Sequence, residues 1–139
     1  MSIDHQKEPK TSHYLGIDFG TSKVGLAVAD SELKIASALK TIPNDQNFLA
    51  ELQKIIEENK ISRIIFGVTD YNSQKDDKKQ TGKMIAEKTG ISLEFWNEMF
   101  TTKMAQENIK ETGAKNIKRL DNQEAARIIL QEWLDTQNT

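Results

Sequence analysis

The stretch YLGIDFGTSKVGLAVAD, from Tyr14 to Asp30, decides the fold. It places a carboxylate, Asp18, inside an apolar run, with glycines at positions 16 and 20. Aspartate is depleted in strands, and burying its charge is costly unless a partner compensates for it. Two interpretations stay open at this point. Asp18 is either a turn residue bonded to its own backbone, or a site residue whose glycine neighbours leave room for a close approach.

The same stretch predicts two strands, Tyr14–Phe19 and Lys23–Asp30, joined by a hairpin turn at residues 20–22. The second strand alternates bulky residues with small ones, namely Val24, Leu26 and Val28 against Gly25, Ala27 and Ala29. One face of this strand is therefore bulky and the other is small. A face of small residues lets a helix approach the sheet closely.

The rest of the chain predicts an α/β fold with a mixed sheet. The expected elements are a third strand at 34–42, a helix capped by Asp45, a buried strand at 63–68, a helix at 78–88, a strand at 91–96, a short helix that Thr101 or Thr102 caps and that ends near Gly113, and a last helix at 122–134. Right-handed crossovers place the fourth and fifth strands beside the first, so the predicted strand order is 3-2-1-4-5 with helices on both faces. The carboxyl ends of the first, fourth and fifth strands then meet at one edge, where α/β sheets carry their sites.

Composition limits the function. The 139 residues fit one domain, which we place at 14–136 after a polar, flexible N-terminal tail at 1–13. With no cysteine and only two histidines, the chain offers no thiolate zinc site or cysteine nucleophile, and a histidine-based site is not expected. No apolar stretch approaches the ~20 residues that a membrane helix needs, and no signal peptide is evident. We therefore expect a cytoplasmic protein without a membrane partner.

Two acidic residues are predicted to meet at the sheet edge. Asp18 ends the first strand, and Glu98 follows the fifth strand. Two carboxylates in one small cleft repel each other unless a cation joins them, and magnesium is a natural guest for such a pair. Taken alone, Glu98 is also explained as a solvated loop residue.

Asp121 begins the last helix in the sequence DNQE, and it has two interpretations. Its spacing to Glu124 is that of a capping box, which by itself explains an acid at this position. The same two residues lie one helical turn apart, so both could also face a metal. The sequence leaves the choice open.

Phosphate contacts are the other candidates. The polar loop at 69–77 carries Lys75, and Lys78 and Lys79 follow it directly. This segment is either a solvated loop or a contact with a phosphate backbone. The other candidate residues for nucleic-acid binding are Thr21, Lys23, Thr101, Thr102, Lys103, Lys118 and Arg119. The net charge is −2, which does not indicate a general nucleic-acid binder but leaves room for one that uses a bound metal.

Four segments together resemble a known family. LGIDFGTSKVGLAVAD, IIFGV, NEMFTT and AARIILQEWLD resemble, in order and spacing, segments of the YqgF/RuvX proteins, which have a ribonuclease H-like fold related to that of the Holliday-junction resolvase RuvC. The resemblance implies a nuclease that uses Mg²⁺ or Mn²⁺ and acts on RNA or branched DNA, in maturation of the small-subunit ribosomal RNA precursor or in junction resolution. It also implies that Asp18 and Glu98 are catalytic metal ligands, with Asp121 as the candidate third acid.

Several positions depart from the pattern of that family, Thr69 and Gln74 in the polar loop among them. Asn97 stands where the family has aspartate, and Met99 where it has arginine. In the last helix, counting back from Ala125 places Asn122 rather than Asp121 at the third acidic position. A slip of one residue turns a side chain by about 100° on a helix, so the two are not interchangeable. Amides in place of acids remove negative charge, and weaker metal binding is expected.

Three functions therefore remain open. The first is a metal-dependent nuclease with an incomplete acidic site. The second is a catalytically weakened or inactive domain that keeps the fold and binds nucleic acid or a protein partner. The third is a nucleotide-binding domain, because Gly-Ile-Asp-x-Gly-Thr also opens the ATPases of the actin and Hsp70 class, although those enzymes need two such lobes. Whether the chain forms a homodimer is also left open.

Overall fold

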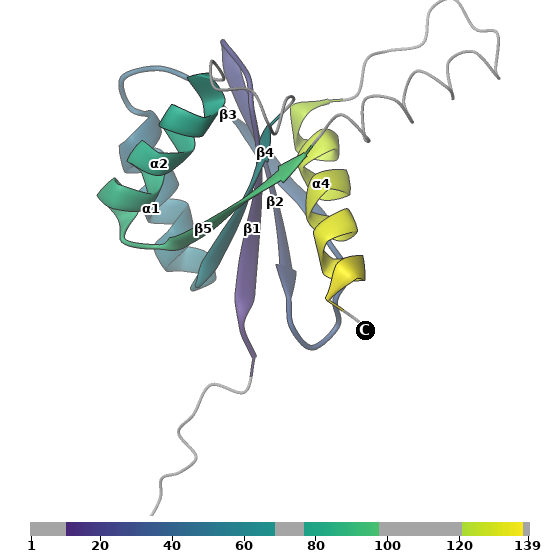
Figure 1. Cartoon of the computed structure of the whole chain (residues 1–139). Helices are drawn as coiled ribbons and strands as arrows, with labels where there is room; N and C mark the ends of the chain where they lie inside the picture. The colour runs from purple at the N-terminus through teal and green to yellow at the C-terminus, as the bar shows by residue number, and fades with distance from the viewer. Residues whose placement is uncertain (1–10, 69–76, 98–120, 138–139) are drawn as a thin grey trace, which may run out of the picture.

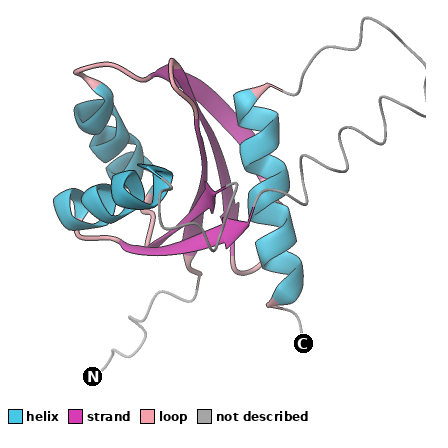
Figure 2. Ribbon diagram, turned by 45° about the horizontal axis from the view of Figure 1, so that its top comes forward, coloured by secondary structure: helices cyan, strands magenta, loops and turns pink. Residues whose placement is uncertain are grey.

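The fold is a three-layer α/β arrangement. The structure, a computed structural model, describes residues 11–68, 77–97 and 121–137. Five strands form one mixed sheet in the order β3-β2-β1-β4-β5. Helices α1 (Phe48–Asn59) and α2 (Asp77–Thr89) lie on one face, and helix α4 (Asn122–Thr136) lies on the other, as Figure 2 shows. The predicted fold class and strand order are confirmed.

The first three strands form an antiparallel meander. They are β1 (His13–Phe19), β2 (Lys23–Asp30) and β3 (Ser37–Pro43). In the β1–β2 turn the backbone N–H of Gly20 donates to the carbonyl of Lys23 at 2.9 Å. The side-chain amide of Asn44, just after β3, donates to the carbonyls of Gly20 at 2.9 Å and Thr21 at 3.1 Å. This amide ties the turn after β1 to the end of β3.

Strand β3 begins later than the predicted residue 34, because the preceding residues form a tight turn. The carboxylate of Asp30 accepts a hydrogen bond from the backbone N–H of Leu33 at 2.7 Å. Lys34 adopts a left-handed conformation with φ 60°. The side chain of Gln131 in α4 accepts from the backbone N–H of Ala36 at 2.8 Å. The backbone N–H groups of Leu33 and Ala36 thus bond to side chains and do not pair with a neighbouring strand.

The second half of the sheet is parallel. It follows α1 (Phe48–Asn59) and consists of β4 (Arg63–Val68), the helix α2 (Asp77–Thr89) and β5 (Ser92–Asn97). Strand β4 pairs in parallel with both β1 and β5, so β1 lies at the centre of the sheet (Figure 1). The carboxyl ends of these three strands therefore share one edge, as predicted. Among the described helices, none is long and apolar enough to cross a membrane.

The predicted cap of the first helix is wrong by two residues. The N-cap of α1 is Asn47 rather than Asp45. Asp45 instead forms the turn before the helix: its carboxylate accepts from the backbone N–H of Asn47 at 2.9 Å, and its carbonyl accepts from Phe48 at 3.0 Å. Aspartate favours both turns and caps because its side chain bonds to nearby backbone N–H groups, so the sequence did not separate the two roles.

The side chains on the two faces of the sheet differ in size, as the alternation in β2 predicted. On the face of α1 and α2, large aliphatic and aromatic residues form the larger core, among them Leu15, Ile17, Val24, Leu26, Leu52, Ile64 and Phe66. On the other face, small residues of β2 lie under the apolar side of α4. Large side chains therefore separate α1 and α2 from the sheet, whereas small side chains let α4 lie close to it.

Helix α4 (Asn122–Thr136) lies very close to β1 and β2. A Cβ placed on Gly16 would lie 2.8 Å from the Cβ of Leu130, and one on Gly25 would lie 2.0 Å from the backbone carbonyl carbon of Asn122. Real Cβ atoms do not make such contacts, so these two positions require glycine. The helix buries Ala126, Ile129, Leu130, Trp133 and Leu134, while Ala125 is half-buried. Each large residue in this set contributes roughly 1.5–3 kcal/mol on burial.

Parts of the predicted organisation lie outside the described residues. These are residues 1–10 of the predicted N-terminal tail, the polar loop at 69–76 and the short helix predicted to end near Gly113. The described end of the tail is attached to the sheet. The backbone N–H of Ser12 donates to the hydroxyl of Ser31 at 2.8 Å, and the backbone N–H of Ser31 donates to the carbonyl of Ser12 at 2.9 Å.

An ion pair supports the first turns of α4. The Nε of Arg127 donates to the carboxylate of Glu124 at 2.9 Å. This hydrogen bond holds the pKa of Glu124 below its ordinary value, because it favours the charged form. A depressed pKa means that the pair stabilises the folded state above the unfolded pKa and ceases to do so as the pH falls through the folded pKa.

We expect Gly25→Ala to destabilise the protein by about 1–3 kcal/mol, because the new methyl group would overlap the backbone of α4. Urea denaturation checks this. The control is Gly90→Asn, at a position with φ 74° where a Cβ would have no neighbour within 4 Å and where asparagine tolerates the left-handed backbone. Equal losses in the two variants would contradict the close contact at Gly25.

We expect Arg127→Met to lower the free energy of unfolding at pH 7 by about 0.2–1 kcal/mol, as for other half-exposed pairs. At pH 3, where Glu124 is largely protonated in the unfolded chain, the difference from the wild type should shrink. Denaturation at both pH values checks the sign. A penalty that is larger at pH 3 than at pH 7 would contradict the assignment.

Candidate functional site

Asp18 lies at the carboxyl end of the central strand, on the side of the sheet that faces α4. It pairs across the antiparallel ladder with Gly25. It is half-buried rather than exposed, although a charged carboxylate favours water. Side chains alternate along a strand, so Asp18 and Gly16 share the face that α4 covers.

Asn122 is the residue that α4 brings to Asp18. Its Nδ2 donates a hydrogen bond to Oδ2 of Asp18 at 3.2 Å, across 104 positions of sequence. The first turn of α4 rests directly on Gly25, which is opposite Asp18 in the ladder. The close packing at Gly25 therefore fixes the helical residue that faces the carboxylate. In Figure 1 the end of β1 and the start of α4 both lie toward the top of the molecule.

The β1–β2 turn closes the other side of this contact. A Cβ on Gly20 would lie 3.2 Å from Nδ2 of Asn122 and 2.6 Å from the carbonyl oxygen of Lys23. The amide of Asn122 is thus confined between Asp18 and the turn. Sequence reasoning did not identify Asn44, whose amide holds this turn in place. Its only signal is its position directly after Pro43, at the break of the third strand.

Asp121 occupies the N-cap position of α4 with an extended backbone, φ −60° and ψ 152°. It is exposed, and in the described structure its side chain makes no capping hydrogen bond. Glu124 bonds to Arg127 instead of completing a capping box. The predicted position of Asp121 at the cap is confirmed, whereas the capping-box contacts are wrong, because Arg127 is a stronger partner for Glu124 than a backbone N–H.

Of the other predicted site residues, some lie near Asp18 and most lie outside the described part of the chain. Thr21 and Lys23 are exposed in and beside the β1–β2 turn, next to Asp18 along the chain. Asn97 is the last residue of β5 and pairs with Val68. Seven of the predicted residues lie outside the described part of the chain, together with Met99: Lys75, Glu98, Thr101, Thr102, Lys103, Lys118 and Arg119.

The side chains at this edge include two that could take part in holding a divalent cation. Asp18 offers carboxylate oxygens, and Asn122 carries an amide oxygen on the side chain whose nitrogen donates to Asp18. Mg²⁺ accepts both kinds of oxygen as ligands. Magnesium is commonly held by one or two carboxylates, with water and substrate phosphate completing its coordination. Within the described ranges, no group of three or more histidine, cysteine, aspartate or glutamate side chains comes together.

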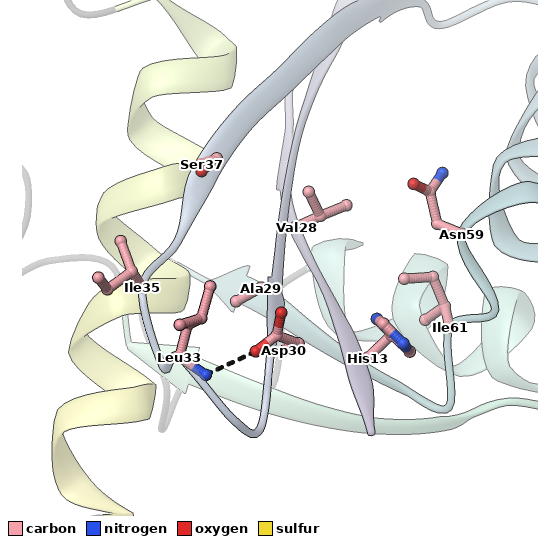
Figure 3. A pocket seen from close by; sticks show the side chains of 9 residues that line it. All are labelled: His13, Val28, Ala29, Asp30, Leu33, Ile35, Ser37, Asn59 and Ile61. Carbon is pink, nitrogen blue, oxygen red and sulfur yellow. Dashed lines mark hydrogen bonds between the residues drawn. The ribbon is translucent and has the colours of Figure 1, made fainter. Parts of the chain in front are cut away.

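A separate pocket lies at the opposite end of β1. Figure 3 shows its lining, which includes His13, Asp30, Leu33, Ile35 and Asn59. Its volume is about 190 Å³. His13 begins β1 and Asp18 is five residues further along, so the two sites are about 17 Å apart at the rise of a strand. The pocket is therefore not part of the Asp18 site.

Comparison with known proteins places the chain in a family. The family model described as "RuvX: Holliday junction resolvase" matches residues 12–136. A protein of Agathobacter rectalis named "Putative pre-16S rRNA nuclease" is 34% identical, with 87% of this chain and 93% of that protein covered. A protein of Dictyoglomus thermophilum with the same name is 31% identical, with 88% and 94% covered.

Solved structures show the same fold at low sequence identity. Thermus thermophilus RuvC in complex with a Holliday junction substrate has a TM-score of 0.57 at 14% identity, covering 91% of this chain and 95% of that one. The fowlpox virus resolvase bound to Holliday junction DNA has a TM-score of 0.58 at 9% identity, covering 91% and 99%. The sheet order and these neighbours establish a ribonuclease H-like fold, and the match over residues 12–136 establishes that the chain belongs to the RuvX family of nucleases.

Proposed function

We propose that the chain is a metal-dependent endonuclease that acts on structured nucleic acid in the cytoplasm, with precursor small-subunit ribosomal RNA as its first candidate substrate. The observation that carries this proposal is the Asp18 carboxylate, held half-buried at the carboxyl end of the central strand against the start of α4. Family membership and the names of the relatives support the reaction class.

Asp18 is the proposed anchor for Mg²⁺ or Mn²⁺. Asn122 offers its amide oxygen beside it, and Glu98 and Asp121 are the proposed further acids. Bound divalent ions would supply an activated water and stabilise the leaving oxygen of the phosphodiester. The chain itself contributes orientation: the sheet fixes Asp18, and the contact at Gly25 fixes the start of α4.

The exposed hairpin turn is the proposed contact for the nucleic-acid backbone. Lys23 carries an ammonium group and Thr21 a hydroxyl, and both are exposed beside Asp18. Such groups position a phosphate without reading sequence. Lys75, Thr101, Thr102, Lys103, Lys118 and Arg119 are proposed to extend this contact. A homodimer remains a prediction.

The second candidate is a family member with weakened catalysis that still binds nucleic acid or a protein partner. The hydrogen bond from Asn122 favours it, because a neutral amide stands beside the carboxylate at a position where the family has an acid. Fewer negative charges hold a dication less strongly. The two candidates share the same fold and differ in turnover.

We expect the wild-type protein to cleave a precursor fragment of small-subunit ribosomal RNA or a four-way DNA junction in millimolar Mg²⁺ or Mn²⁺. Asp18→Asn should reduce the rate at least about 100-fold, since it removes a charged ligand of the proposed metal. Gel-based cleavage assays with both substrates check this and also separate RNA from DNA as the substrate.

Asp135→Asn is the matched control for this experiment. It makes the same isosteric change at the far end of α4, where an asparagine oxygen can still accept the hydrogen bond from Gln131. The control should cleave at the wild-type rate. Substrate binding without cleavage by the folded wild type would favour the weakened member. Cleavage that Asp18→Asn leaves unchanged would overturn the proposed site.

A further inference from the structure

The side-chain amide of Asn122 has two chemically different ends, and the structure turns its nitrogen toward Asp18. We propose that Asn122 sets the metal affinity of this site: its N–H pairs with the Asp18 carboxylate in the metal-free protein, and the amide must turn its oxygen inward when Asp18 holds a cation. This inference rests on the proposed metal site and deepens it, because it assigns a role to a residue that replaces an acid.

The first step of the argument is that an N–H group and a cation compete for the same carboxylate. The Nδ2 of Asn122 donates to Oδ2 of Asp18 at 3.2 Å. A hydrogen bond to an ionised acceptor is about twice as strong as one between neutral groups. A cation that uses Oδ2 must first displace this donor, so the hydrogen bond lowers the apparent affinity for metal.

The second step is that the backbone of Asn122 already touches the strand and cannot move closer to it. Its carbonyl carbon and oxygen both lie 2.0 Å from the position that a Cβ on Gly25 would take, and the backbone N of the next residue, Gln123, lies 2.5 Å from it. The helix therefore rests directly on the strand at this point. A shift of α4 away from the sheet would expose the side chains that the helix buries, among them Ile129 and Leu130. We therefore expect Asn122 to respond to a cation through its side-chain torsions.

The third step concerns the space around the amide. Nδ2 lies 3.2 Å from the Cβ position of Gly20, so glycine leaves just enough room for the amide beside the turn. The oxygen and nitrogen of an amide have nearly the same size, and rotation about the last side-chain bond exchanges them. The space beside the turn therefore accepts either orientation of the amide. In one orientation its nitrogen donates to the carboxylate, and in the other its oxygen faces a metal.

The experiment compares Asn122→Asp with the wild type by thermal unfolding in Mn²⁺ and Mg²⁺ titrations. The variant replaces the competing donor by a second carboxylate. Without metal it should be less stable than the wild type, because two like charges then face each other. With metal it should be stabilised more strongly, and its half-saturating metal concentration should be at least about tenfold lower, as expected when a charged oxygen ligand is added.

Gln123→Glu is the matched control. It makes the same amide-to-acid change one residue away, where the side-chain oxygen accepts from the Thr41 hydroxyl at 3.2 Å and can still do so as a carboxylate. It adds the same charge to the same turn without facing Asp18. Its half-saturating metal concentration should stay within about twofold of the wild type. An equal shift in both variants would show a general charge effect and overturn the proposal.

Nuclear magnetic resonance of the wild type provides a second readout that needs no variant to fold. On titration with Mg²⁺, the side-chain amide signals of Asn122 should move, while those of Asn59, an amide in α1, should stay in place. An unmoved Asn122 amide in a protein that Mg²⁺ stabilises would overturn the proposal, as would an unchanged metal affinity of a folded Asn122→Asp variant.

This test is separable from that of the proposed function. Metal-dependent cleavage that depends on Asp18, together with an unchanged affinity in Asn122→Asp, would leave the nuclease standing and remove the role of Asn122. Tight metal binding by Asn122→Asp without cleavage by either protein would support the role of Asn122 and remove the nuclease.

Discussion

The rest of the structure depends on one packing constraint, which is the direct contact between the first turn of α4 and the backbone of β2 at Gly25. A helix normally rests on side chains, but here its own backbone reaches the strand. The small residues of β2 and Gly16 of β1 make this approach possible along the helix. Any side chain at Gly25 would push the start of α4 away from the strand that carries Asp18.

This contact brings two residues that are far apart in the sequence next to each other. Asp18 and Asn122 are separated by 104 positions, yet their side chains share a hydrogen bond. Strand β1 delivers the carboxylate, and Gly25 is its partner in the ladder. Because the helix is seated on that same glycine, its first residue meets the carboxylate. The glycine-rich turn, held by the Asn44 amide, then closes the remaining side.

The chemistry of the site follows from its charge. A carboxylate beside an amide donor is a satisfied arrangement in which the charge of Asp18 has a partner from the protein itself. A carboxylate and an amide repel each other less than two carboxylates do, and they also attract a dication less strongly. At the proposed metal site, stability of the fold and affinity for metal would therefore be opposed at Asn122, as they often are at functional sites.

The sequence by itself determined the sheet. The alternation in β2 and the apolar run of β4 predict these strands to within a residue or two, because both are local patterns of side chains. It also predicted the small face that receives α4. The start of β3 and the cap of α1 were less accurate, since Asp30 and Asp45 bond to nearby backbone groups in ways that a pattern does not separate. Only the tertiary structure decided which residue of DNQE faces Asp18: it turns Asn122 toward the carboxylate and leaves Asp121 exposed at the cap. That choice depends on the rotation of α4 about its axis, which is set by backbone contact with Gly25 far away in the sequence and not by anything local to the helix.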